Sequence, residues 1–192
     1  MGRSFANLHI KSDNLEKTVE ALRELSTRHG GVLGYSKAEA PESQAVMYVS
    51  QSNESWVSVL HEYLVWGTVK KVGKALSGLI KEPVMTAGYM NEEIFELSFF
   101  EQGELAAERI FCEPWTREEY GQLREERVND DYLQQVLNIQ GEAAGELIRM
   151  TSPDQAVEKL SEIAGMSLWC DYEWIPYEET LQARFAKYEF GR

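Results

Sequence analysis

Residues 4–111 pass between strand-like and helix-like patterns in an order that constrains the fold more than any other feature of this sequence. Alternating apolar and polar residues, or short apolar runs between turn residues, predict strands at 4–11, 32–35, 45–51, 56–63, 84–90, 94–100 and 105–111. Apolar residues at spacings of three and four predict only two helices, one between Ser12-Asp13 and Gly30-Gly31 and one at 68–80. A parallel doubly wound sheet needs helices between its strands throughout, so this order excludes it.

The same order indicates an α+β fold. Read as β-α-β-β-α-β-β with hairpins, it is similar to a ferredoxin-like split β-α-β arrangement. We therefore predict a largely antiparallel sheet with both helices on one face. One hairpin is predicted at residues 101–104, where Gly103 can adopt a positive φ.

The pattern changes after Pro114. Helices are predicted from the capping box at 116–119 to about Arg127, after Asn129, at 153–164 and at 178–189. Alternation between Met166 and Trp174 predicts one further strand. We therefore expect an α+β sheet domain at 1–113 and a helical, acidic extension at 114–192 that packs on it.

Acidic residues are concentrated in the second half of the chain. The 192 residues include 19 Lys+Arg and 32 Asp+Glu, which gives a net charge of −13. Residues 1–90 hold 10 basic and 9 acidic residues, whereas residues 91–192 hold 9 and 23. A negative potential repels nucleic-acid phosphates, so nucleic acid is excluded as a direct partner, and a basic protein is the partner that such a surface fits. Acidity that only maintains solubility is the alternative.

The ends of the sequence and its cysteines predict a cytoplasmic protein. The first residues lack the apolar core of a secretory signal, and no run approaches the roughly 18 apolar residues of a membrane span, so no membrane is expected. Cys112 and Cys170 are not spaced as a CxxC motif and are expected to be buried thiols. His61 and Glu62 are adjacent in a predicted strand and point to opposite faces, so we predict no metal site and no cofactor.

No catalytic motif is present in the sequence. There is no G-x-S-x-G, and neither cysteine has a histidine nearby along the chain, although approach to His9 or His61 in space stays open. Lys70, Lys71 and Lys74 lie together on the second predicted helix. They fit a solvated helix face, an acidic partner, or docking against the acidic second half.

Tryptophans and carboxylates supply the candidate binding residues. Tryptophan and tyrosine are the residues that most often anchor protein interfaces. If Cys170 and Tyr172 face the core, the strand at 166–174 places Trp169, Asp171 and Glu173 on its outer face; burial of both faces is the alternative. The candidate binding residues are Trp56, Glu62, Trp115, Trp169, Asp171 and Glu173.

Four segments together resemble an uncharacterised family of bacterial cytosolic proteins. They are WVSVLHE at 56–62, ALS at 75–77 before PV at 83–84, FELSFFEQGEL at 95–105 and EKLSEIAGM at 158–166. The resemblance implies a shared fold and a bacterial cytosolic setting. It implies no activity, so no catalytic residue is carried over.

These observations leave two functions open. The first is a non-catalytic interaction protein that docks a basic partner with an acidic, aromatic surface, in its extreme form an immunity or antitoxin-like protein masking a basic nuclease. The second is a small-molecule binder or enzyme with a pocket between the sheet and the C-terminal helices, using Asp171 and Glu173. An exposed patch of acids with tryptophan or tyrosine favours the first function. A deep apolar cleft that holds both carboxylates favours the second.

Overall fold

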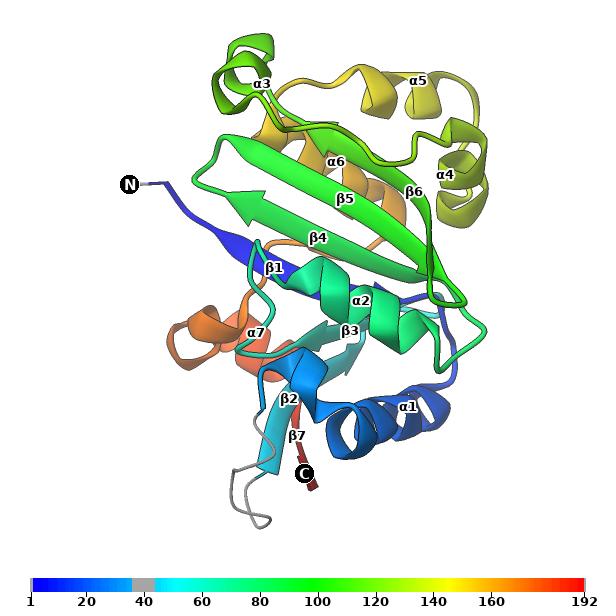
Figure 1. The fold of residues 1–192 in the computed structure, drawn as a ribbon, viewed down its shortest axis with the longest axis vertical. Coiled ribbons are helices and arrows are strands. Elements are labelled where there is room, and N and C mark those ends of the chain that lie inside the picture. Colours follow the sequence, from blue (N-terminus) through cyan, green and yellow to red (C-terminus); the bar gives the residue numbers. More distant parts are fainter. Residues whose placement is uncertain (1, 36–43, 192) are drawn as a thin grey trace.

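The computed structural model describes residues 2–35 and 44–191, and within them an α+β fold with a seven-stranded sheet. The strand order is β6-β5-β4-β1-β3-β2-β7, and every neighbouring pair is antiparallel. The strands are β1 (Phe5–Ile10), β2 (Gln44–Gln51), β3 (Val57–Leu60), β4 (Val84–Met90), β5 (Ile94–Glu101), β6 (Glu104–Phe111) and β7 (Ala186–Gly191). Figure 1 shows how strongly this sheet twists between its two ends.

Two helices from the first half cover one face of the sheet. Helix α1 (Leu15–Arg28) follows β1 and is capped by Asn14, whose side chain accepts from the Lys17 amide. Helix α2 (Val69–Ser77) lies between β3 and β4. Both helices share one buried cluster with the residues of β1 that point to this face, Ala6, Leu8 and Ile10.

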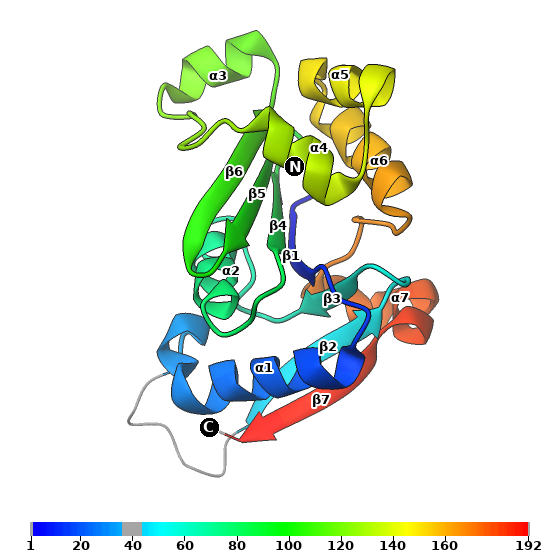
Figure 2. The same ribbon diagram turned by 90° about the vertical axis from the view of Figure 1, so that its right-hand side faces the viewer.

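Helices from the second half cover the other face. They are α4 (Asp130–Leu137), α5 (Gly141–Arg149) and α6 (Pro153–Ala164), and they share a buried cluster with Phe95, Leu97 and Phe99 of β5. Figure 2 shows α2 on one side of β4, β5 and β6 and these three helices on the other. The predicted helix at 153–164 is confirmed, with Ser152 capping its start and Gly165 ending it.

The strand order departs from the ferredoxin-like prediction. That arrangement has four strands, whereas here β5 and β6 extend the sheet beyond β4, and β7 extends it beyond β2. The predicted strands at 84–90, 94–100 and 105–111 are confirmed, and no bound differs by more than one residue. The strand expected at 32–35 is wrong, because Gly30–Leu33 forms a 3₁₀ helix.

The predicted strand between Met166 and Trp174 is also wrong. This segment is an irregular loop that leads into a 3₁₀ helix, η2 (Tyr172–Tyr177). Its alternation is real, because Leu168 and Cys170 are buried and Ser167 is exposed, but no neighbouring strand pairs with it within the described residues. The Asn7 side chain of β1 donates instead to the carbonyls of Leu168 and Cys170.

The end of the chain and the segment after Pro114 differ from prediction as well. The helix expected at 178–189 stops early: α7 (Glu179–Arg184) ends before β7, which pairs with β2. The spacing of Tyr188 and Phe190 is compatible with one face of a helix or of a strand. These residues form a strand because the edge of β2 offers free backbone groups for pairing. The helix expected from 116 to about Arg127 begins earlier and is shorter: α3 (Pro114–Tyr120) has proline in its first turn and ends at Gly121, which has a φ of 64°. Helix α5 was not predicted.

Candidate functional site

Three of the predicted carboxylates line one small cavity beside β1. Glu62 reaches it from the segment after β3, and Asp171 and Glu173 reach it from the start of η2. The rest of the lining is mostly apolar or aromatic: Ser4, Phe5, Ala6, Leu64, Val65, Trp66 and Tyr172. Its volume is about 110 Å³. Pockets for drug-sized ligands measure about 300 Å³ or more, so this cavity admits a ligand of only a few atoms.

Asp171 has a structural task at this cavity. It is 9% exposed, and its two carboxylate oxygens accept from the Ala6 amide at 3.0 Å and from the Glu173 amide at 3.1 Å. Burial raises the pKa of Asp171, although these two hydrogen bonds oppose the shift. The carboxylate therefore caps η2 and ties it to β1.

Trp56 lies in the core and not on a surface. It is 3% exposed and packs in the cluster between the sheet and α6. Its backbone amide donates to Asn53 Oδ1, and the Asn53 amide group donates to the carbonyl of Ala164 at the end of α6. This turn draws the indole inward, so the prediction that Trp56 contacts a partner is corrected.

Trp169 is half-buried, and its ring is engaged within the chain. Its indole Nε1 donates to Glu158 Oε1 at 2.7 Å, and the Arg3 guanidinium lies 4.5 Å from the ring centroid. The rings of Phe5 and Tyr89 meet it edge-on. Little of the ring is left for a partner.

Trp115 is the one of the three predicted tryptophans that lies fully on the surface. It is 67% exposed on α3, beside Glu118 and Glu119, which are also exposed. Tyr120 at the end of α3 is 40% exposed and donates its hydroxyl to Glu93 Oε2. We call these five residues (Glu93, Trp115, Glu118, Glu119 and Tyr120) the α3 surface.

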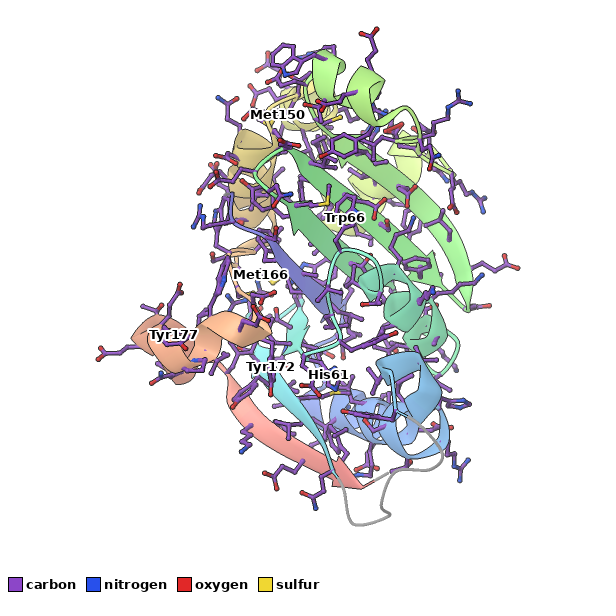
Figure 3. All side chains as sticks on the ribbon, turned by 60° about the vertical axis from the view of Figure 1, so that its left-hand side comes forward. His61, Trp66, Met150, Met166, Tyr172 and Tyr177 are labelled. Atoms are coloured by element: carbon purple, nitrogen blue, oxygen red, sulfur yellow. The ribbon has the colours of Figure 1, made fainter. Side chains whose placement is uncertain are left out.

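A second exposed aromatic was missed as a site residue. Tyr177 at the end of η2 is 86% exposed, and the adjoining Glu178 and Glu179 are exposed as well. Figure 3 shows Tyr177 at the outer end of the corner that η2 and α7 form. A continuous helix at 178–189 was expected in place of this corner. The Tyr-Glu-Glu run after Pro176 is the sequence signal that indicates it.

A buried hydrogen-bond network connects His9 with Cys170 through Asn7. Asn7 Nδ2 lies 3.4 Å from Cys170 Sγ, and Asn7 Oδ1 lies 2.6 Å from His9 Nε2. On the other side of the ring, His9 Nδ1 lies 2.8 Å from Ser58 Oγ, which the Arg184 guanidinium also contacts. The Cys–His approach that the sequence left open is therefore indirect.

The hydrogen bonds around His9 are those that a neutral ring can make. Because the Asn7 side-chain amide donates elsewhere, its Oδ1 accepts from His9 Nε2, and Nδ1 of a neutral ring accepts from the Ser58 hydroxyl. Burial, together with the positive charge of Arg184, lowers the pKa of His9 to about 3. Burial also raises the pKa of Cys170 to about 12. A neutral imidazole and a protonated thiol, both fully buried, do not form a nucleophile–base pair.

The acidic second half does receive one of the three lysines of α2. Lys70 Nζ lies 2.5 Å from Glu108 and 3.7 Å from Glu96, so docking of this lysine against the second half is confirmed. Glu108 is 1% exposed and also accepts from Ser98 Oγ and from the Glu126 amide. Burial, offset in part by Lys70, raises the pKa of Glu96 to about 7.

Within residues 2–35 and 44–191, no group of three or more His, Cys, Asp or Glu side chains is arranged to hold a metal ion. No helix in the same residues is long and apolar enough to cross a membrane. Comparisons with protein-family models, with curated proteins and with solved structures find no match to this chain.

Proposed function

We propose that this chain is a non-catalytic interaction protein that docks a basic protein partner on the α3 surface. The observation that carries the proposal is Trp115, a large aromatic side chain left 67% exposed on a helix rich in carboxylates. Burying such a ring is worth more to an interface than most other contacts, which is why tryptophan dominates binding hot spots.

The charge around Trp115 supports a basic partner. Glu93, Glu118 and Glu119 are exposed, and Tyr120 is oriented by its bond to Glu93. Arg117, the cation within α3, donates to Glu125 and to the Ile110 carbonyl, so its charge is directed inward. Exposed carboxylates around an aromatic anchor accelerate the association of a positively charged protein and orient it. An immunity or antitoxin-like protein that masks a basic nuclease is the narrower form of the proposal.

The small-molecule alternative has its best support in the cavity of Glu62, Asp171 and Glu173. This cavity lies between strand β1 of the sheet and the start of η2. Its volume of about 110 Å³ and the engaged oxygens of Asp171 favour the partner-binding proposal over this one.

The experiment is capture of partners with the immobilised full chain, compared among wild type, Trp115→Ala and Tyr177→Ala. We expect wild type and Tyr177→Ala to capture a protein with a basic isoelectric point. Trp115→Ala should capture at least about tenfold less of it. Binding should weaken between about 50 and 500 mM NaCl, because exposed charges are screened by salt.

Tyr177→Ala is the matched control, since it removes another exposed aromatic side chain from a different acidic corner. Both variants should keep the stability of wild type within about 0.5 kcal/mol, because neither ring is packed in the core. Capture that survives Trp115→Ala, or partners that are acidic and insensitive to salt, would reject the proposal.

Two narrower proposals concern the fold and its setting. The central order β4-β1-β3-β2, with α1 and α2 as the crossing helices, supports a ferredoxin-like unit that β5, β6 and β7 extend. We likewise propose that the chain belongs with the bacterial cytosolic proteins that it resembles and that it lies in the cytoplasm.

A further inference from the structure

Strand β7 forms one edge of the sheet, and its outer side has no partner within the described residues. Its inner side pairs with β2 from Ala186 to Gly191. No described residue outside the β2 ladder exchanges a backbone hydrogen bond with these six residues. Figure 2 shows β7 as the outermost strand at its end of the sheet. An unpaired edge of this kind is a template for another strand.

The side chains of β7 alternate between two faces. Tyr188 and Phe190 pack with the cluster under α1, where Arg23 lies 5.2 Å from the Phe190 ring centroid. Lys187 and Glu189 point to the opposite face, are both about half exposed, and form an ion pair of 3.4 Å along the strand. The exposed side of the edge therefore carries one cation and one anion two residues apart.

We propose that β7 pairs antiparallel with β7 of a second copy of this chain, around a two-fold axis at Tyr188. This register places Lys187 of each copy directly opposite Glu189 of the other, which forms two opposite-charge pairs across the strands. On the α1 face it places Ala186 opposite Phe190, so that a small side chain faces a large one, and it places the two Tyr188 rings side by side. The two sheets then form one continuous sheet.

Charge complementarity selects a second copy as the occupant of this edge. A two-fold contact requires a surface that is complementary to itself. The order cation, aromatic, anion in residues 187–189 meets this condition when it is read antiparallel against itself. Five residue pairs bury less surface than a stable complex, so the dimer should be of micromolar or weaker affinity.

The first test measures mass against concentration by sedimentation, from about 10 μM to about 1 mM, for the full chain and charge variants. Lys187→Glu replaces both opposite-charge pairs by like-charge pairs, and we expect it to raise the dimer dissociation constant about tenfold. The double variant Lys187→Glu/Glu189→Lys restores complementarity and should dimerise like wild type. Lys74→Glu, at an exposed position on α2, is the matched control and should have no effect.

The second test is oxidative cross-linking of Tyr188→Cys. Residues opposite each other in an antiparallel pair have Cα atoms about 5 Å apart, within the range of a disulfide. We expect a covalent dimer to form faster than with Lys74→Cys. A chain that stays monomeric at the highest concentration, a double variant that fails to recover dimerisation, or equal cross-linking of both cysteine variants would overturn the proposal.

Discussion

The two edges of the sheet are protected in different ways. At β6, the segment 117–127 runs along the outer side of the strand and bonds with it: the Glu108 amide donates to the Arg127 carbonyl at 2.8 Å, and the Ile110 amide donates to Glu125 Oε1 at 3.3 Å. Arg117 donates to the Ile110 carbonyl and to Glu125. At β7, the described residues supply no such bonds. One edge is closed by its own chain, and the other is the edge that we propose pairs with a second copy.

The polar groups behind the two edges differ as well. Beneath β6, the buried Glu108 carboxylate pairs with the partly exposed Lys70, which also contacts Glu96. On the β7 side, Arg184 at the end of α7 holds Ser52 and Ser58, and Ser58 contacts the neutral His9. The contacts beneath β6 join charged groups, whereas those behind β7 run from the Arg184 guanidinium inward to the uncharged His9 ring of the central strand β1. The two sets of contacts can therefore be perturbed separately.

The largest effect is expected from Glu108→Ala. The substitution leaves the Lys70 ammonium without its closest partner and removes the acceptor of the Ser98 hydroxyl and the Glu126 amide. Loss of these three contacts of a buried carboxylate lowers the free energy of unfolding by about 3 kcal/mol. Urea denaturation measures it. Glu104→Ala, at an exposed position of the same strand, should change this free energy by less than about 0.5 kcal/mol.

The next effect is a pH dependence that arises at His9 in the central strand β1. His9 has a folded pKa of about 3, below its ordinary value of 6.5, so the unfolded chain binds a proton in this window that the folded chain does not. The stability that neutral His9 contributes is complete above pH 6.5 and is lost as the pH falls, by about 2 kcal/mol between pH 6.5 and 4.5.

His9→Gln is the control for that pH dependence. It removes the titrating ring, so the difference in stability between wild type and variant should narrow as the pH falls through this window. Glu96, with its raised pKa of about 7, acts with the opposite sign in both proteins and cancels from the difference. A difference that stays constant from pH 6.5 to 4.5 would show that His9 is not held neutral.

The smallest of the three effects is expected from Arg117→Ala, which opens the covered edge. The variant loses donors to the carbonyls of Ile110 and Leu123 and to Glu125, at a cost of about 1.5 kcal/mol. Hydrogen exchange of the Ile110 amide should accelerate more than that of Leu97 in the strand interior. Arg124→Ala, an exposed neighbour, should alter neither measurement. Unchanged exchange at Ile110 in Arg117→Ala would mean that the segment stays closed without its arginine.

Much of the fold was predictable from the sequence where its signals are local. The strands around Gly103, the stripe of α1 and the cap and stop of α6 each lie within a few residues of the groups that determine them. The candidate site was predictable only in part. Trp115 is exposed as expected, and the three carboxylates do meet, but Trp56 is in the core and Trp169 is covered by Arg3.

The sequence by itself determined the α+β class, the two helices that share one face of the sheet and the concentration of acid after residue 90. Only the tertiary structure decided that the alternating segment 166–174 is not a strand and that residues 186–191 are one. The physical reason is that an extended segment becomes a strand only where a neighbour offers free backbone groups. The carbonyls of Leu168 and Cys170 accept from the side-chain amide of Asn7, whereas Ala186–Gly191 pairs with the open edge of β2.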